Sequence, residues 1–126
     1  MTAASFGLGP IGQIACTVHD LETAVTFYRD KLGLKHLYSF PNLAFFDCDG
    51  VRLMLSLPEQ PADDRGNSVL YFEVNDLQAA YETLRARGVA FEDAPHLIAT
   101  MPDHELWMAF LRDPDGNLLG LMSEVR

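Results

Sequence analysis

The sequence Asp20-Leu21-Glu22-Thr23-Ala24 recurs as Asp76-Leu77-Gln78-Ala79-Ala80, and Asp47-Cys48-Asp49-Gly50 recurs as Asp113-Pro114-Asp115-Gly116. The first motif of each copy is typical of a helix that begins after an aspartate cap, and the second is typical of a turn between strands. An alternating strand precedes each helix, and apolar strands follow it. The chain is therefore predicted to contain two copies of a strand–helix–strand–strand–strand module.

The composition predicts one compact domain. A chain of 126 residues with 48% hydrophobic and 21% charged residues is long enough to bury a sizeable core. We expect an α+β fold with two βαβββ modules in a single domain over residues 1–126. The modules are expected at about 11–57 and 68–124, joined by a connection at 58–67 that is rich in Pro, Asp, Gly and Asn.

The charge balance argues against several kinds of partner. The formal net charge is −9, and the acidic residues are scattered along the sequence. Such a chain is expected to bind neither nucleic acid nor an anionic membrane surface. No basic and apolar leader and no apolar run of membrane-spanning length is present, so a cytoplasmic location is expected. Cys16 and Cys48 lie in apolar strand patterns and are expected to be free thiols.

Strand alternation predicts which side chains line a cleft. Ile14, Cys16 and Val18 form the packing face of the first strand, and Leu70, Phe72 and Val74 form that of its counterpart. The opposite faces carry Gln13, Ala15 and Thr17; Arg52, Met54 and Ser56; Val69, Tyr71 and Glu73; and Leu118, Gly120 and Met122. A few polar groups on an apolar lining are typical of small-molecule sites. Arg52 and Glu73 would anchor a charged ligand, pair with each other or face solvent.

The second copy has about ten extra residues between Val89 and Leu111, which are expected to form a long hairpin around 94–106. Long loops on a rigid scaffold commonly carry function. His104, beside Glu105 or opposite Glu73, is a candidate general acid or base. His96 is a candidate ligand-binding residue, and the two imidazoles are candidate metal ligands if the hairpin brings them together; both are otherwise solvated.

Trp107 follows this hairpin and has two interpretations. It either packs as a large strand residue or forms an aromatic wall over a bound ligand. The segment Asp113-Pro114-Asp115-Gly116-Asn117 is interpreted as a hairpin turn rather than a cation site, because Pro and Gly supply the backbone angles that such a turn needs.

Three segments together resemble the vicinal oxygen chelate superfamily. They are Val18-His19-Asp20-Leu21, Phe27-Tyr28-Arg29-Asp30-Lys31-Leu32-Gly33-Leu34 and Arg112-Asp113-Pro114-Asp115-Gly116-Asn117-Leu118-Leu119. That group includes glyoxalase I, bleomycin resistance proteins and extradiol dioxygenases, and the resemblance extends from about Ile11 to Glu124. It implies paired modules whose sheets curl into an open barrel-like cleft, commonly in a homodimer. Chemistry varies among members, so the fold alone does not give the function.

The resemblance also implies where metal ligands would stand. The positions that match the metal-dependent enzymes are Gln13, Met54, Val69 and Gly120. Glutamine serves as a ligand in some glyoxalase I enzymes, but valine and glycine offer no side-chain donor and methionine offers only a soft thioether. Gly120 is expected to leave open space where an enzyme has its glutamate. No cofactor is therefore expected, and a divalent metal is the less favoured alternative.

Two classes of function remain open, with a third that is weaker. The first is a metal-free pocket that binds a small organic molecule, as bleomycin resistance proteins sequester drugs. The second is a glyoxalase-like lyase, isomerase or dioxygenase that works through Glu73, His104 or a metal held in a non-standard way. The third is a protein recruited mainly for assembly with another protein. Overall acidity favours a cationic ligand, whereas Arg52 favours an anionic one.

Overall fold

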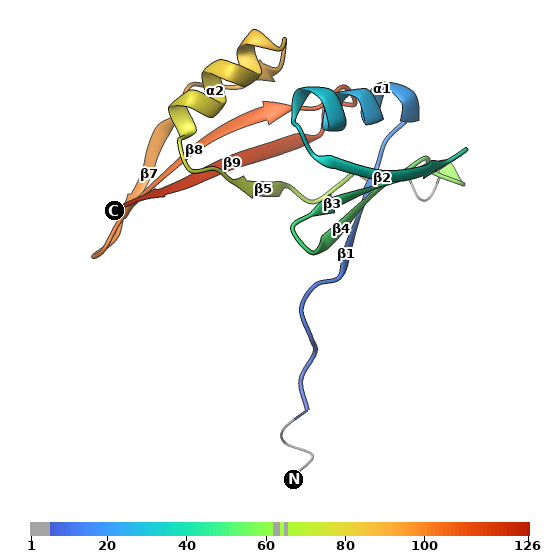
Figure 1. The fold of residues 1–126 in the computed structure, drawn as a ribbon, viewed down its shortest axis with the longest axis horizontal. Coiled ribbons are helices and arrows are strands. Elements are labelled where there is room, and N and C mark those ends of the chain that lie inside the picture. Colours follow the sequence, from blue (N-terminus) through green and yellow to red (C-terminus); the bar gives the residue numbers. More distant parts are fainter. Residues whose placement is uncertain (1–5, 62–63, 65) are drawn as a thin grey trace.

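The computed structural model describes residues 6–61, 64 and 66–126, and it consists of two modules that lie side by side (Figure 1). Each module is a sheet covered on one face by a helix, and both helices lie on the same side of the molecule. The expected α+β class with two modules is confirmed. The sheets remain two separate sheets and do not close into a barrel.

The first module follows the expected order of elements. Strand β1 (Gln13–Thr17) leads into α1 (Leu21–Thr26) and the π-helical segment η2 (Phe27–Lys31). Strands β2 (Lys35–Phe40), β3 (Leu43–Cys48) and β4 (Val51–Ser56) complete the module. The strand order across the sheet is β1-β4-β3-β2, with β1 parallel to β4 and the other pairs antiparallel.

The second module has the same plan with one addition. It comprises β5 (Leu70–Glu73), α2 (Leu77–Ala86), β6 (Ala90–Phe91), β7 (His96–Thr100), β8 (Glu105–Arg112) and β9 (Leu118–Val125). The order is β5-β9-β8-β6, and β7 also pairs with β8. The extra residues therefore form the expected long hairpin, because the partner of β8 is split into the short β6 and the longer β7.

Both helices begin where the sequence predicts. The Asp20 carboxylate accepts a hydrogen bond from the Thr23 N–H at 3.1 Å, and the Asp76 carboxylate accepts one from the Ala79 N–H at 3.0 Å. Each bond satisfies a backbone donor that the first turn of a helix leaves unpaired.

The first helix differs from the regular helix that its apolar spacing predicts. From Phe27 onward it widens into a π-helical turn, in which the Leu32 N–H bonds to the Phe27 carbonyl five residues back. The consecutive side chains Phe27 and Tyr28 of this turn are both buried. Gly33, with φ of 77°, then ends the helix.

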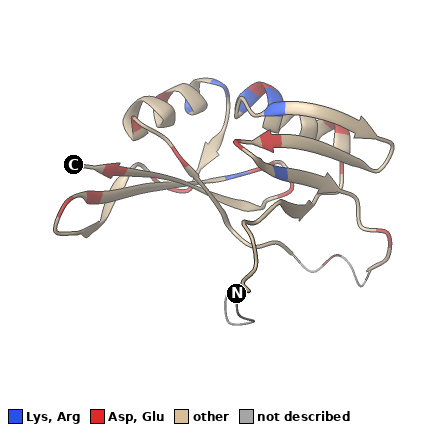
Figure 2. Cartoon of the chain, turned by 60° about the horizontal axis from the view of Figure 1, so that its bottom comes forward, with Lys and Arg blue, Asp and Glu red and all other residues tan. Residues whose placement is uncertain are grey.

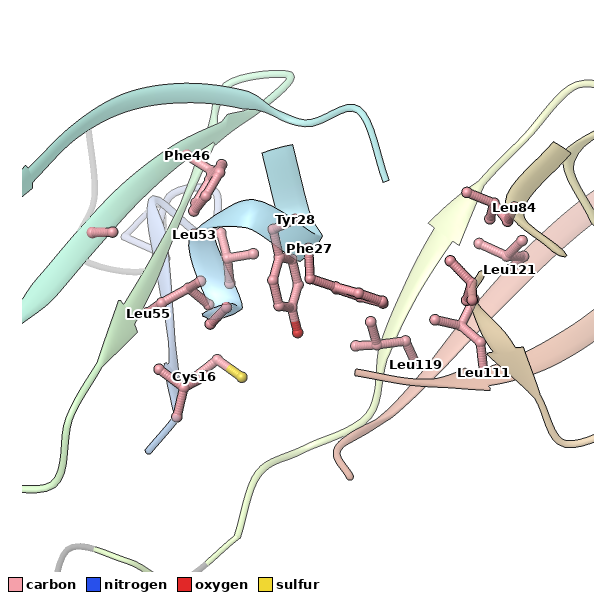
Figure 3. Packing of buried hydrophobic residues seen from close by; sticks show 14 of the residues in the cluster. Cys16, Phe27, Tyr28, Phe46, Leu53, Leu55, Leu84, Leu111, Leu119 and Leu121 are labelled. Atoms are coloured by element: carbon pink, nitrogen blue, oxygen red, sulfur yellow. The ribbon is translucent and has the colours of Figure 1, made fainter. Parts of the chain in front are cut away.

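The buried core continues from one module to the other. In Figure 3, Phe27 points out of the first module toward Leu119 of the second, while Tyr28 stands between Phe27 and the strands of its own sheet. Burial of these large side chains is the main favourable contribution to folding. Within the described residues, no helix is long and apolar enough to span a membrane.

A buried polar network also joins the modules. The Tyr28 hydroxyl donates to Asp113 Oδ2 at 2.8 Å, and Asp113 accepts further hydrogen bonds from the N–H of Asp115 and from the N–H and side chain of Asn117. Burial raises the pKa of Tyr28, so its hydroxyl remains protonated and able to donate. The 113–117 segment is the expected turn, but it also anchors one module to the other.

Asn67 and Asn117 extend this network to the backbone of β1. The Asn67 side chain accepts from the Thr17 N–H at 2.8 Å and donates to the Thr17 carbonyl at 3.0 Å. Asn67 also donates to Asn117 Oδ1 at 2.9 Å. A residue of the connection between modules thereby pairs the free edge of β1, which would otherwise present unpaired backbone groups.

His19 forms a second, exposed link between the modules. Its Nδ1 lies 2.7 Å from an Asp115 oxygen, and its Nε2 lies 2.8 Å from an Asp64 oxygen. Hydrogen bonds that the imidazole donates to the Asp64 carboxylate and, secondly, to the Asp115 carboxylate raise the pKa of His19 above its ordinary value. The protonated imidazole therefore interacts more favourably with the folded chain than with the unfolded one.

This link predicts a pH-dependent stability difference between the wild type and His19→Gln. Because the folded pKa is raised, the stabilisation is complete below the unfolded pKa of about 6.5 and is lost as the pH rises through the folded pKa. We expect the variant to lower Tm more at about pH 5.5 than at about pH 8.5. Thermal melts at the two pH values measure this, and an equal Tm difference at both would contradict it.

Candidate functional site

The face of the first sheet that is turned away from α1 is open. Its side chains form three cross-strand rows: Gln13, Arg52, Asp47 and Lys35; Ala15, Met54, Phe45 and Tyr38; and Thr17, Ser56, Leu43 and Phe40. The other face is buried under the helix, with Ala44, Phe46, Leu53 and Leu55 all in the core. The alternation along β1 thus places Gln13 and Thr17 on the open face, as predicted.

Aromatic side chains gather at the outer half of this open face. The ring centroids of Tyr38 and Phe45 are 5.0 Å apart, and those of Tyr38 and Phe40 are 5.6 Å apart. Tyr38 and Phe40 are about half exposed. The sequence analysis did not single out these three residues. Their signal was the alternation of aromatic residues on both sides of the Pro41-Asn42 turn, which places them on one face of a hairpin.

Arg52 lies beside these aromatic residues. Its guanidinium carbon is 5.6 Å from the centroid of the Phe45 ring. Gln13 is its neighbour on β1, and the Gln13 amide nitrogen lies 3.9 Å from the Met54 sulfur. The Asp47 carboxylate in the same row accepts from the Gly50 N–H at 3.0 Å. The row therefore places two cations, Arg52 and Lys35, one carboxylate and one amide next to an aromatic surface.

The open face of the second sheet carries the other predicted cleft residues. Its main rows are Glu73, Met122, Met108 and His96, and Tyr71, Gly120 and Phe110. Tyr71 and Glu73 are exposed, as the alternation predicts. Arg52 and Glu73 belong to different sheets and, within the described residues, form no salt bridge, so one of the three interpretations of this pair does not occur.

The space above Gly120 is filled rather than open. A Cβ atom added to Gly120 would lie 2.6 Å from Tyr71 Cδ2 and 3.2 Å from Phe110 Cε1. The rings of Tyr71 and Phe110 meet edge to face over this position, with centroids 5.9 Å apart. The expectation that Gly120 leaves open space for a ligand is therefore wrong, because its cross-strand neighbours occupy that space.

The hairpin does not bring its two histidines together. His96 stands in the row of Met108, with Nδ1 3.1 Å from the Ala94 carbonyl oxygen. His104 lies at the hairpin tip, with Nδ1 2.7 Å from Asp103 Oδ1. The proposed pairing of the imidazoles as metal ligands is thus not formed, because antiparallel pairing separates them along the hairpin.

Trp107 lies on the other face of the second sheet. It pairs with Ser123 and Leu97, it packs against the core, and its indole N–H donates to Glu105 Oε1 at 3.1 Å. The structure therefore does not bring Trp107 together with Tyr71 or Met122, which point to the open side. A shallow pocket beside it is lined by the start of α2.

A groove of about 800 Å³ lies between the modules. Val69, Tyr71 and Glu73 of the second module line it, together with Lys35 and Asp47 of the first and an apolar base that includes Ile14, Leu53 and Phe72. Neither Gln13 nor Met54 lines this groove. The metal-ligand positions of the two modules are thus not brought together there.

The residues at the expected metal positions do not suit a divalent metal. Of Gln13, Met54, Val69 and Gly120, only Gln13 has an oxygen donor. Elsewhere in the described part of the chain, no three His, Cys, Asp or Glu side chains are grouped to hold an ion. Burial raises the pKa of the Cys16 thiol to about 11, so this side chain is not a thiolate ligand or nucleophile at neutral pH.

The charges are distributed over the whole molecule. Figure 2 shows Asp and Glu in both modules rather than in one patch, with several Lys and Arg residues near the ends of the helices. The open faces therefore differ in local charge despite the net charge of −9. Arg52 marks the face of the first sheet, and Glu73 marks that of the second.

Comparisons with known proteins agree on one family. The sequence profile of the Glyoxalase/Bleomycin resistance protein/Dioxygenase superfamily matches residues 10–121. The YraH protein of Bacillus subtilis, described as uncharacterized, is 32% identical over 124 residues, which cover 85% of this chain and 92% of that protein.

Solved structures of the same superfamily have a similar fold. A member from Sphaerobacter thermophilus is 27% identical with a TM-score of 0.75, and the match covers 93% of this chain and 98% of that one. A lactoylglutathione lyase from Agrobacterium tumefaciens is 24% identical with a TM-score of 0.71, over 93% of this chain and 95% of that one. The likeness to the lyase concerns the fold alone.

Proposed function

Because the chain belongs to the Glyoxalase/Bleomycin resistance protein/Dioxygenase superfamily, we propose that it uses the superfamily fold to bind a small organic molecule without a metal ion, as a sequestering protein does. The open faces of the two sheets are the proposed binding surfaces. Gln13, Thr17, Arg52 and Met54 belong to the first, and Tyr71, Glu73, Met122 and His96 belong to the second. The free cysteines Cys16 and Cys48 suit the reducing cytoplasm, where we place the protein.

The observation that carries this proposal is the lack of space for a side chain at Gly120. A carboxylate at this position would need the space that the Tyr71 ring occupies 2.6 Å away. A thioether at Met54 and an aliphatic side chain at Val69 add no hard donor, so Gln13 alone does not hold a divalent ion. The aromatic side chains and thioethers on the open faces are instead suited to contact with an apolar part of a ligand.

We also propose that the protein acts as a homodimer. The open sheet faces leave large apolar side chains in solvent, and the extended segment before β1 adds Phe6, Leu8 and Ile11, each at least two-thirds exposed (Figure 1). A monomer rarely leaves so much apolar surface uncovered. A second copy would cover part of it and could complete the cleft that the two separate sheets leave open.

The first test is metal analysis of protein that was purified without a metal-binding tag and then supplied with Zn, Ni, Mn or Fe. We expect no metal to be retained near one equivalent per chain, because one amide oxygen is a poor site. Near-stoichiometric metal would overturn the proposal. It would favour the alternative of a glyoxalase-like lyase, isomerase or dioxygenase, with Glu73 and His104 as the first residues to test.

A further inference from the structure

The open face of the first sheet carries an aromatic platform formed by Tyr38, Phe40 and Phe45. Phe45 contacts both of the others, with ring centroids 5.0 Å and 6.5 Å away. Tyr38 is 45% exposed and Phe40 is 54% exposed. Single exposed aromatic residues are ordinary, but three in mutual contact on a sheet face, with ring planes inclined by 44° to 90°, form an apolar surface of the kind that ligands cover.

Two hydrogen-bond donors border this platform and lack strong partners. Arg52 lies over the Phe45 ring, 5.6 Å from its centroid, and forms no salt bridge with any residue that the structure describes. The nearest carboxylate in its row, that of Asp47, is engaged by the Gly50 N–H of the turn. Among the residues that the structure describes, the Gln13 side chain makes only a long contact with the Met54 sulfur. The guanidinium and the amide are therefore free to bind a group placed beside the rings.

The arrangement selects a class of ligand. Resting on the function proposed above, we infer that the platform binds an aromatic carboxylate, with its ring against the exposed Tyr38 ring and its carboxylate at Arg52 and Gln13. A guanidinium offers parallel donors that match a carboxylate, and hydrogen bonds between charged groups are stronger than neutral ones. The net charge of −9 attracts no anion by itself, so recognition depends on this local pair of donors.

The probe that tests this inference is 2-naphthoate, titrated into the full chain by calorimetry in buffer with EDTA. Arg52→Gln is expected to weaken its binding about tenfold or more, since a charged hydrogen bond is worth about 1.5–3 kcal/mol and about 1.4 kcal/mol is a factor of ten. The matched control is Arg85→Gln, which removes a second arginine, 5.3 Å from the Tyr81 ring on α2. We expect this control to bind 2-naphthoate as the wild type does.

The aromatic part is tested separately. Tyr38→Thr keeps a strand-forming residue at an exposed position. It is expected to weaken binding of 2-naphthoate several-fold, because it removes a contact between two aromatic rings that is worth about 0.5–1.5 kcal/mol. NMR signals of the Arg52 side chain and the Tyr38 ring are expected to shift on titration. Unchanged affinity in both Arg52→Gln and Tyr38→Thr would place the probe elsewhere and overturn the inference.

A cationic probe separates this inference from the function on which it rests. If 2-naphthylmethylammonium binds and 2-naphthoate does not, the protein still binds small molecules without metal, but the assignment of an aromatic acid is wrong. If neither probe binds and the variants change only the sedimentation of the protein, the platform is an interface between copies, which also overturns the inference. Binding of 2-naphthoate that EDTA abolishes would overturn the metal-free function instead.

Discussion

Asp113→Ala is expected to lower the free energy of unfolding by about 3–5 kcal/mol, because it removes several hydrogen bonds to a buried carboxylate, each worth about 1.5–3 kcal/mol, and leaves their donors unpaired. The carboxylate is 5% exposed and accepts hydrogen bonds from Tyr28, Asp115 and Asn117. Its removal leaves the Tyr28 hydroxyl, which is fully buried, without an acceptor. Urea unfolding of the wild type and the variant measures the difference.

The repeat in the chain supplies a matched control for this substitution. Asp47 occupies the equivalent turn of the first module, where its side chain accepts only the Gly50 N–H at 3.0 Å in a half-exposed setting. Asp47→Ala is expected to cost about 1 kcal/mol, the value of one ordinary hydrogen bond. Equal losses of unfolding free energy in the two alanine variants would show that Asp113 acts as a simple turn residue. The buried hydrogen bonds of Asp113 would then contribute little to stability.

Gly120→Glu, which supplies the carboxylate that metal-dependent relatives carry, is expected to destabilise the protein by about 1–3 kcal/mol without creating a metal site. The new Cβ would meet the Tyr71 ring at 2.6 Å and Phe110 at 3.2 Å, so these rings must move. Urea unfolding measures the loss, and metal analysis of the variant measures the second part of the prediction.

A double-mutant cycle identifies the cause of this loss. Tyr71→Ala removes the ring that the new side chain meets, so Gly120→Glu should be better tolerated in that background. Leu118→Glu places the same carboxylate two residues earlier on the same face and serves as the control for charge. If Gly120→Glu costs as much with Tyr71→Ala as without it, the loss does not come from the close approach of the ring.

Much of the fold could be predicted from local patterns. Aspartate caps, Asp-Gly turns and strand alternation act within a few residues, and Asp20 and Asp76 cap their helices as expected. The π-helical turn at Phe27–Lys31 could not be predicted, because adjacent apolar residues such as Phe27 and Tyr28 are equally compatible with a regular helix. Apolar spacing alone does not contain that information.

The candidate site was predictable only in part for the same reason. Alternation placed Gln13, Arg52 and Glu73 on open faces, since the direction of a strand side chain follows from its parity. Whether Gly120 opens a cavity depends on the rotamer of Tyr71, which belongs to another strand. Trp107, by contrast, lies on the helix side of its sheet as alternation with the buried Ala109 and Leu111 on β8 requires.

The hydrogen bond between Tyr28 and Asp113 joins residues that are 85 positions apart, and this has a consequence for synthesis on the ribosome. When the first module has emerged, its helix carries a tyrosine hydroxyl that has no acceptor, and the edge of β1 lacks the side chain of Asn117. These contacts arrive only when residues 113–117 have been synthesised. Loop closure over such a distance is slow, so the nascent first module is expected to wait for the second before it gains its full stability. Formation of the turn at 113–117 would then determine when the first module reaches its full stability.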